Sequence, residues 1–482
     1  MNRPWTGRDL DRVDGQKKVT GGATYAAETQ VAQVAHAVIV GATTAPGTIT
    51  AIDTAAAERA PGVIAVVTHL TAPPLPGAKA KTKPNDRVVQ VLQGAEVLYH
   101  DQPIALVVAD TLERAQDAAR RVEASYDGRP AVTDLEADLV SARPPSSAGG
   151  PTSPADSKRG DVDAALAAAP HRLDVTYRTP VETHNPMEPH ATIAVWRGPD
   201  QLTVYDSTQA IFAVRRRLAE VFGLAPDAVR VVNHFCGGGF GGKGAPWSHV
   251  MLAALGARIT NRPVKLVVTR QQMQSLCGHR PKTVQKLSIA AEKTGRLTAI
   301  RHDVLSETSR FDEFTEGCSA ISRMLYACPN VVTSQRLVEI DIPTPTYMRA
   351  PGESTGTFAL ESALDELAYA VRLDPVELRR INHADVDPSD GRPWSSKSLL
   401  ECYHQGAERF GWAPRARAPR ATRDGRYLIG SGVATATRPA PQQPSAARAR
   451  LGADGRVLVQ AGTQEIGTGT YTIMTQVAAD AL

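Results

Sequence analysis

Residues Phe235–Gly244, with the sequence FCGGGFGGKG, are the most informative part of the chain. They follow an apolar run, residues 228–235, that predicts a strand, and they precede residues 247–258, which predict a helix. Glycines between a strand and a helix let backbone N–H groups approach a ligand closely and point at an anion or a heterocycle. The sequence therefore predicts a loop that binds a ligand through its backbone.

Two nucleotide-binding patterns can also be read in this loop. Gly237, Gly239 and Gly242 satisfy G-x-G-x-x-G, but the acidic residue that a dinucleotide site requires about twenty positions later is missing. Gly237, Gly242 and Lys243 satisfy G-x-x-x-x-G-K, but Gly244 replaces the hydroxyl residue that would bind Mg²⁺. Both patterns lack a residue that their chemistry needs, and a loop with a purely structural role is a further alternative.

The composition of the 482 residues is that of a globular protein, with 42% hydrophobic and 22% charged residues. A net charge of +4 is small for a nucleic-acid binder, and no stretch is apolar enough to span a membrane. The N-terminus lacks the apolar segment of a secretory signal, so we expect a cytoplasmic protein, or a periplasmic one exported with a signal-bearing partner. The five scattered cysteines predict free thiols.

Patterns of apolar residues and turn residues predict three folded regions. Residues 17–135 alternate short strands with helices, such as residues 112–124, and predict an α/β domain. The rest of the chain divides into four regions. A Pro-, Ser- and Gly-rich linker spans residues 136–160, and a first α+β domain spans 161–412. A basic linker of solvated arginines spans 413–426, and the start of a second α+β domain spans 427–482. Within the first domain, residues 354–371 predict an amphipathic helix, and Asp374–Glu377 predict a capping box.

An internal repeat links the two later domains. Residues 195–224 read as strand, turn, strand, Ser-Thr-Gln and helix, and residues 447–482 repeat that order with Gly-Thr-Gln. The first copy continues into the glycine loop, whereas the second ends inside its helix at Leu482. We therefore expect two similar facing domains, the second incomplete, in a chain truncated at its C-terminus.

Four ordered motifs resemble those of the molybdenum-cofactor-binding subunit of the xanthine dehydrogenase/aldehyde oxidase family, closest to the bacterial aldehyde oxidoreductase type. They are GGGFGGK in the glycine loop, STQ ending at Gln209, YMRAPGE around Arg349, and GTQEIGTGTYT at residues 462–472. Residues 97–127 resemble the α/β hammerhead domain of that family. The resemblance implies an α+β fold in which the hammerhead domain precedes two molybdopterin-binding domains.

The resemblance also assigns roles to residues. Gln209 would donate a hydrogen bond to an oxo ligand of molybdenum. The backbone of the glycine loop and of the Arg349 segment would line the metal, at Gly239, Phe240, Gly241 and Arg349. A turn in the second domain would hold the pterin and its phosphate, at Gly467, Thr468 and Gly469. No protein side chain would ligate the metal, because the pterin dithiolene does so. The cofactor would be molybdenum–molybdopterin, with its cytosine dinucleotide form as one option.

Simpler interpretations exist for several of these side chains. Gln209 could cap the following helix, and Arg349 could form a surface ion pair. Arg438 could face a substrate or a cofactor phosphate, but a plain loop cation is the simpler expectation. We expect His184 and His190 to serve structural polar packing rather than chemistry.

Two departures from the family pattern bear on the substrate. Purine-oxidising members carry a glutamate where this chain has Gly244, and an arginine where it has Gly317. Without that pair a purine loses its orienting hydrogen bonds. The substrate pocket, which includes Gly244 and Pro351, is thus expected to take an aldehyde or an aromatic heterocycle.

The catalytic base is the other departure. The resemblance places the general-base glutamate beyond Leu482, and Glu353 and Glu465 match neighbouring positions instead. Electrons would leave through iron–sulfur and FAD partner subunits, and a further chain could supply the missing part. The isolated chain is expected to be inactive. The alternatives are a non-catalytic relic or assembly module that binds pterin, and an unrelated nucleotide-binding protein that uses Lys243.

Overall fold

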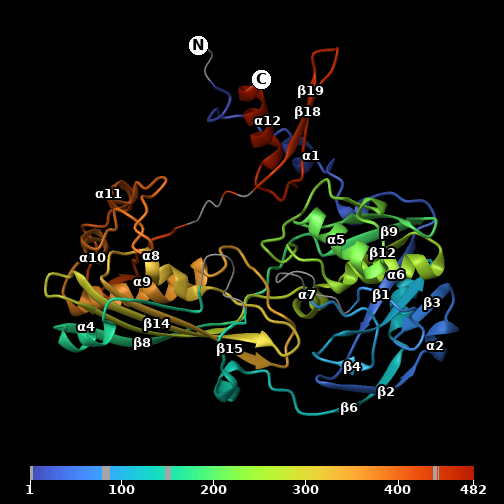
Figure 1. Ribbon diagram of the computed structural model, residues 1–482, viewed down its shortest axis with the longest axis horizontal. Coiled ribbons are helices and arrows are strands. Elements are labelled where there is room, and N and C mark those ends of the chain that lie inside the picture. Colours follow the sequence, from blue (N-terminus) through green and yellow to red (C-terminus); the bar gives the residue numbers. More distant parts are fainter. Residues whose placement is uncertain (1–3, 79–86, 147–153, 438–441, 443) are drawn as a thin grey trace.

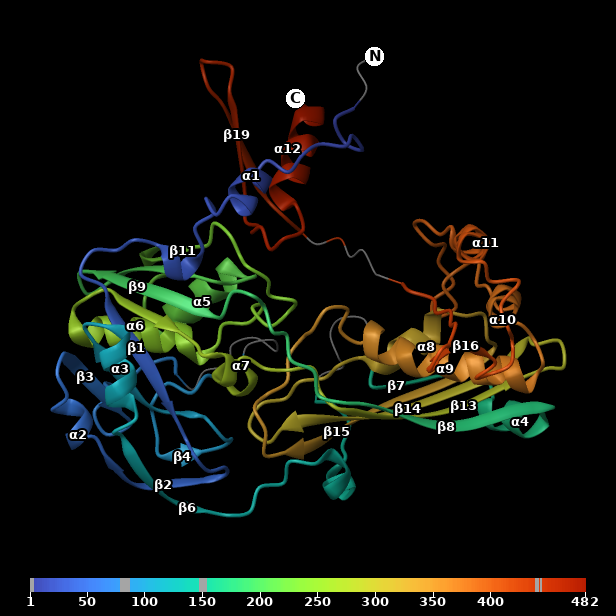
Figure 2. The same ribbon diagram turned by 180° about the vertical axis from the view of Figure 1, so that it is seen from behind.

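The computed structural model describes residues 4–78, 87–146, 154–437, 442 and 444–482. Two lobes, each built on a β-sheet, lie side by side, and a smaller unit formed by both ends of the chain stands above one of them (Figures 1 and 2). Within the described ranges, no helix is long and apolar enough to cross a lipid bilayer.

A seven-stranded sheet forms the first lobe and carries the glycine loop. In spatial order its strands are β11 (Val229–Val232), β10 (Gln201–Asp206), β9 (Ala191–Arg197), β12 (Val264–Val267), β1 (Ala35–Gly41), β5 (Pro103–Ala109) and β3 (Val63–Thr68). Strands β1 and β12 pair in parallel, so one sheet runs from the N-terminal strands into those beside the loop. Helix α6, Ser248–Thr260, packs on β9 and β12 and is buried from Ser248 to Ala257, because its sequence is apolar on nearly every side.

The rest of the first lobe surrounds this sheet. A three-stranded sheet has the order β4-β2-β6, and α3 packs on β1 and β5. The bounds of these elements and of the remaining helices of the lobe are β2 (Gly47–Asp53), α2 (Ala55–Glu58), β4 (Glu96–Val97), α3 (Leu112–Ala119), β6 (Glu123–Gly128), α5 (Ile211–Phe222) and α7 (Arg270–Leu276).

The second lobe is a five-stranded sheet covered by helix α9, Glu353–Ala370, which packs on β8 and β13. The strand order is β7 (Asp156–Arg159), β15 (Asn330–Ile340), β14 (Leu297–Ser309), β13 (Thr283–Ala291) and β8 (His171–Thr179). Leu360, Leu364 and Leu367 of α9 are fully buried, and their i, i+4, i+7 spacing is what the sequence pattern predicted. The other helices are α4 (Val162–Ala168), α8 (Ile321–Met324), α10 (Pro375–Ile381) and α11 (Leu399–Phe410).

The smaller unit contains the second copy of the internal repeat. Strands β18 (Ala447–Leu451) and β19 (Val457–Ala461) form a hairpin, and helix α12 (Thr470–Ala481) follows it, in the order that the repeat predicts. Helix α1 (Gly15–Val19) lies beside α12 (Figures 1 and 2). Another hairpin, β16 (Thr422–Asp424) with β17 (Tyr427–Ile429), precedes this unit.

Several local predictions are wrong in detail. The helix predicted over 112–124 ends at Ala119, because the residues from Glu123 onward pair with β2 as strand β6. The strand predicted over 228–235 ends at Val232. Asp374 caps α10 by accepting the N–H of Val376, but Glu377 pairs with Arg380, so the capping box is not reciprocal.

The two ranges predicted as linkers contain ordered contacts. Residues 156–159 form edge strand β7 on β15, and residues 147–153 of the same range lie outside the described residues. In the basic range, Arg415 is not simply solvated. Its guanidinium pairs with Asp374 at 2.7 Å and lies over the ring of Trp412.

Candidate cofactor-binding site

The glycine loop is a tight turn that requires glycine at several positions. The carbonyl oxygens of Gly239 and Gly241 accept hydrogen bonds from the N–H groups of Gly242 and Gly244. Gly241 has a φ of 106°, and a Cβ atom there would lie 2.2 Å from the carbonyl oxygen of Tyr347. A larger residue would therefore be strained by its own backbone and would also clash with the neighbouring segment.

Gln209 is held against this loop by its side-chain oxygen. Its Oε1 accepts the N–H groups of Gly241 at 2.9 Å and Lys243 at 3.3 Å, while its Nε2 has no hydrogen-bond partner among the described residues. Ala210 is the N-cap residue of α5, no side chain caps the helix, and the N–H of Ala210 donates to the Thr208 hydroxyl, so Gln209 is not the helix cap. Because the oxygen is fixed, the amide group of Gln209 is left to donate to a ligand.

The segment around Arg349 forms a second wall beside the loop. The N–H of Arg349 donates to the carbonyl oxygen of Phe240 at 2.8 Å. Arg280, whose guanidinium also pairs with Glu316 at 3.3 Å, donates to the carbonyl oxygens of Met348 and Arg349. The side chain of Arg349 is exposed and forms no ion pair with a described residue, so the predicted surface ion pair is not found. Arg280, which the sequence analysis did not single out, thus holds this wall in place.

A buried ion pair fixes both ends of the glycine loop. The side chain of Lys243 is 0% exposed, and its Nζ donates to Glu188 Oε2 and to the Glu188 carbonyl oxygen at 2.8 and 2.9 Å. The same carboxylate oxygen accepts the N–H of Gly237 at 2.8 Å. Because Lys243 is buried and paired, it cannot serve a nucleotide phosphate, which argues against the G-x-x-x-x-G-K interpretation.

The two histidines of the segment before β9 have structural roles, as predicted. His184 Nε2 donates to the carbonyl oxygen of Tyr347 at 2.6 Å, and His190 Nε2 lies 3.3 Å from that of Gly242. Burial lowers the pKa of both imidazoles, so they are neutral and each supports one wall of the site.

The predicted turn in the second unit is organised by Glu465. This carboxylate is 1% exposed and accepts the N–H groups of Gly467, Gly469 and Thr470. Burial alone would raise the pKa of Glu465, but the hydrogen bonds from Gly469 and Gly467 and the charge of a nearby lysine lower it. Of the three predicted residues, only Thr468 has an N–H without a partner in the described part of the chain.

Contacts between the two copies of the repeat bring the turns together. Gln464 Nε2 donates to the carbonyl oxygen of Gln209, and the Tyr471 hydroxyl donates to that of His234 at 3.0 Å. Gln464 occupies in Gly-Thr-Gln the position that Gln209 occupies in Ser-Thr-Gln, so the repeat itself was the signal that could have identified it. The glycine loop and the Gly467–Gly469 turn therefore border the same region.

The remaining predicted residues are less tightly connected. Gly244 is the last residue of the loop and is half-buried, and Pro351 is half-buried next to the Arg349 segment. Arg438 lies outside the described residues. Within those residues, no group of three or more His, Cys, Asp or Glu side chains is arranged to hold a metal ion.

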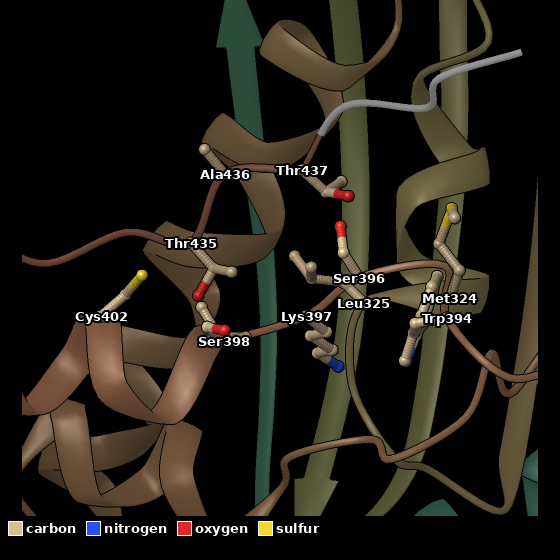
Figure 3. Close-up of a pocket in the computed structure, with 11 residues that line it drawn as sticks. Met324, Leu325, Trp394, Ser396, Lys397, Ser398, Cys402, Thr435, Ala436 and Thr437 are labelled. Atoms are coloured by element: carbon tan, nitrogen blue, oxygen red, sulfur yellow. The ribbon is translucent and has the colours of Figure 1, made fainter. Parts of the chain in front are cut away.

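A separate cavity of about 280 Å³ lies in the second lobe, between α8, α11 and residues 435–437 (Figure 3). It is lined by Trp394, Lys397, Cys402 and Thr435 among others, and by none of the predicted site residues. The hydroxyl of Thr435 hydrogen-bonds to Tyr326 at 2.7 Å, so one wall is a packed polar network. This cavity plays no part in the candidate site.

Models of known protein families match most of the chain. A molybdopterin cofactor-binding domain matches residues 147–383, and a second one matches residues 405–482. The a/b hammerhead domain of aldehyde oxidase and xanthine dehydrogenase matches residues 20–130. The predicted fold class is thereby confirmed, since a hammerhead domain precedes molybdopterin-binding domains of mixed helix and sheet.

Individual relatives agree with the family models. The chain is 41% identical to the aldehyde oxidoreductase molybdenum-binding subunit PaoC of Escherichia coli K12, over 99% of this chain and 64% of that protein. It is 29% identical to the xanthine dehydrogenase molybdenum-binding subunit of Escherichia coli O157:H7, over 97% of this chain and 65% of that protein. The aldehyde oxidoreductase of Desulfovibrio gigas superposes with a TM-score of 0.77 at 25% identity, over 95% of this chain and 52% of that one.

The chain thus spans less than two thirds of the length of these relatives. Over that span, the similarity in sequence and in structure includes both turns of the candidate site. The chain belongs to the xanthine dehydrogenase/aldehyde oxidase family, in which it corresponds to the molybdenum-binding subunit.

Proposed function

We propose that this chain holds a molybdenum–molybdopterin cofactor between its two turns, as part of a molybdenum hydroxylase that oxidises aldehydes. The observation that carries the proposal is the hydrogen bond from Gln464 to the backbone carbonyl of Gln209. It joins the turn of the second unit to a residue whose side-chain Nε2 has no partner among the described residues. The similarity to a subunit named as an aldehyde oxidoreductase supports the choice of reaction.

The residues of this chain fit such a cofactor by shape and by hydrogen bonding. A Cβ atom at Gly239 would lie 2.3 Å from Gln209 Oε1, so glycine is needed there for Gln209 to take its position. Gln209 would donate its Nε2–H to an oxo ligand, while the backbone at Phe240, Gly241 and Arg349 lines the metal. When bound, the cofactor supplies the metal that accepts the substrate's electrons.

In the second unit, the unpaired N–H of Thr468 would contact the pterin or its phosphate. The N–H groups of Gly467 and Gly469 would shape the turn rather than bind, because they already donate to Glu465. The cytosine dinucleotide form is the proposed cofactor, and its extra phosphate would extend from this turn.

The substrate is proposed to be an aldehyde or an aromatic heterocycle, with water as the oxygen source. Gly244 and Gly317 provide no side chains where a purine would need an acid and a base. Electrons would pass to iron–sulfur and FAD subunits. Turnover is proposed for the assembled enzyme, in which a glutamate would act as the general base.

Cofactor loading tests the proposal directly. The chain would be produced in a host that makes the molybdenum cofactor, and molybdenum and pterin would be measured after gel filtration. We expect stoichiometric amounts of both. A chain that retains neither, under conditions in which the PaoC subunit loads, would overturn the proposal.

The role of Gln209 is tested in the assembled enzyme. There, Gln209→Ala should lower kcat for an aromatic aldehyde roughly a hundredfold, as the loss of one positioned donor does elsewhere, while the cofactor stays bound. Gln460→Ala, which changes an exposed glutamine on β19, is the matched control. Unchanged turnover in Gln209→Ala would exclude the assigned role, and loading without any turnover in the assembled wild type would favour the non-catalytic alternative.

A further inference from the structure

Residues 4–19, here called the N-terminal arm, run along helix α12 (Figures 1 and 2). The carboxylate of Asp480 accepts the N–H groups of Trp5 and Thr6, and Gln476 Nε2 donates to the carbonyl oxygens of Trp5 and Arg8. The two ends of the chain therefore form one structural unit. The matched hammerhead model begins only at residue 20, so no family model covers the arm.

The arm continues from α12 to the turn at Gly467–Gly469. The N–H of Val13 donates to the Thr472 hydroxyl at 3.1 Å, and Arg12 Nη1 donates to the Gly467 carbonyl oxygen at 2.8 Å. Lys18 Nζ lies 3.3 Å from Glu465 Oε1, the oxygen that accepts the N–H groups of Gly467 and Gly469. Two cations of the arm thus contact the turn itself.

Lys18 neutralises two buried carboxylates, those of Asp14 and Glu465. Glu465 is 1% exposed and Asp14 is 5% exposed, and Lys18 Nζ contacts both carboxylates, at 3.3 and 2.5 Å. Without Lys18, both buried carboxylates would lose the ammonium group that pairs with them, and burial of unpaired charges is strongly unfavourable. Glu465 would then leave its position, and the N–H groups of the turn would lose their acceptor.

The same arrangement occurs in the first unit. There, Glu188 accepts a loop N–H from Gly237 and pairs with the buried Lys243. In each unit, therefore, a glutamate accepts N–H groups of the ligand-facing turn, and a lysine neutralises that glutamate. The difference is that the second lysine comes from the opposite end of the chain.

Lys18 also reaches the first unit. Its Nζ lies 5.8 Å from the centre of the Phe235 ring, at the start of the glycine loop, in a cation–π contact. A single arm residue consequently touches both turns of the candidate site.

We propose that the N-terminal arm stabilises the second cofactor turn, Gly467–Gly469. In this proposal Lys18 is the positioning residue, which holds the turn in its ligand-binding form through Glu465. The contacts of Arg12, Val13 and Lys18 support the claim that the arm holds the turn. The claim that the held turn binds the cofactor rests on the proposed function. Lys18 does not touch the cofactor in this scheme, but acts through Glu465.

Lys18→Met tests the proposal, with Lys17→Met as the matched control, because Lys17 is the preceding residue and is exposed. In Lys18→Met, amide hydrogen exchange of residues 465–472 should accelerate roughly tenfold or more, and the fraction of chains that keep molybdenum and pterin through gel filtration should fall. Lys17→Met should match the wild type in both measurements. Lys18→Arg should restore both, since the guanidinium keeps the charge.

The two measurements separate the possible failures. Unchanged exchange at residues 465–472 in Lys18→Met would overturn the proposal, whatever the cofactor content. Faster exchange with full pterin retention would overturn the positioning role. If the wild type binds no pterin at all, the proposed function fails, and the exchange comparison still decides whether the arm holds the turn.

Discussion

The two copies of the internal repeat form the same local structure in very different surroundings. In the first copy, the hairpin β9–β10 lies inside the seven-stranded sheet, and Ile193 and Val204 are fully buried. In the second copy, the hairpin β18–β19 pairs with no other described strand, and Leu451 and Leu458 are 73% and 56% exposed. A shared order of strand, turn, strand and helix therefore fixes the local fold, while burial depends on the neighbouring strands.

The same difference extends to the two turns. The glycine loop packs against neighbouring side chains and backbone, although Phe240 is 43% exposed, and the buried Lys243 fixes it through Glu188. The Gly467–Gly469 turn is more open, and its order depends on Glu465 and on the N-terminal arm. We therefore expect substitutions to have larger effects in the first unit than at matching positions in the second.

The largest effect should come from Lys243→Met. Removing the ammonium leaves Glu188 as a buried carboxylate with no cation, which typically costs about 3–5 kcal/mol. Hydrogen exchange of α6 and β10 should report this loss in the first lobe. Lys286→Met, at an exposed position of β13, is the control and should change little. A small effect of Lys243→Met would contradict the view that packing fixes the first turn.

A matched pair of glycine substitutions compares the two turns directly. Gly241 and Gly467 have similar φ values, 106° and 104°, but a Cβ atom at Gly241 meets a carbonyl oxygen at 2.2 Å, whereas one at Gly467 meets nothing within 4 Å. Gly467→Ala should cost only the left-handed backbone strain, about 1 kcal/mol. Gly241→Ala adds a clash with backbone and should cost about 2–5 kcal/mol in all. Thermal unfolding of both variants checks this, and equal losses would refute the contrast.

Much of the fold was predictable because its elements follow local periodicity. Helix α5 follows Ser-Thr-Gln within residues 195–224, as the repeat predicts, and the repeat also predicted β18, β19 and α12. The errors arose where tertiary pairing prevailed over local pattern. The predicted helix extends to residue 124, yet Glu123 and Ala124 pair with β2, and no local signal reports that pairing.

The site was predictable only in part, for a related reason. Gln209 and the glycine loop were found because they are short, unusual motifs, and their contacts run over a modest separation in sequence. Arg280 and Lys18 look like ordinary surface cations in the sequence. Their roles depend on contacts with segments far away in the chain, which only the folded structure brings together.

The pH dependence of stability should have opposite signs in the two units. Burial raises the pKa of Asp206 in the first unit to about 7, so its native carboxyl keeps a proton that the unfolded chain releases above about pH 4. Its contribution to stability therefore falls as pH rises from about 4 to 7. Glu465 has a lowered pKa, so its contribution is present above its unfolded value and is lost as pH falls further.

Two variants isolate these contributions. The stability of Asp206→Asn relative to the wild type should rise with pH between about 4 and 7, by on the order of 1 kcal/mol per pH unit at most. The deficit of Glu465→Gln should instead shrink as pH falls below about 4.5. Burial lowers the pKa of His249, beside Asp206, to about 3, so the native His249 side chain stays neutral between about pH 4 and 7. Urea unfolding across this pH range checks both signs, and a flat difference for Asp206→Asn would contradict the first.

The smallest effect should come from Gln464→Ala, which removes one of the direct hydrogen bonds between the units and leaves that of Tyr471 to His234. Losing that bond to the Gln209 carbonyl should cost about 1 kcal/mol. If the Lys243–Glu188 pair holds the first turn, and contacts with other segments hold the second, hydrogen exchange should accelerate at residues 465–472 and stay unchanged at residues 237–244. Gln460→Ala, on the exposed side of β19, should alter neither. Equal acceleration in both turns would mean that the first turn also depends on its partner, because Lys243 and Glu188 alone would then be insufficient to hold it.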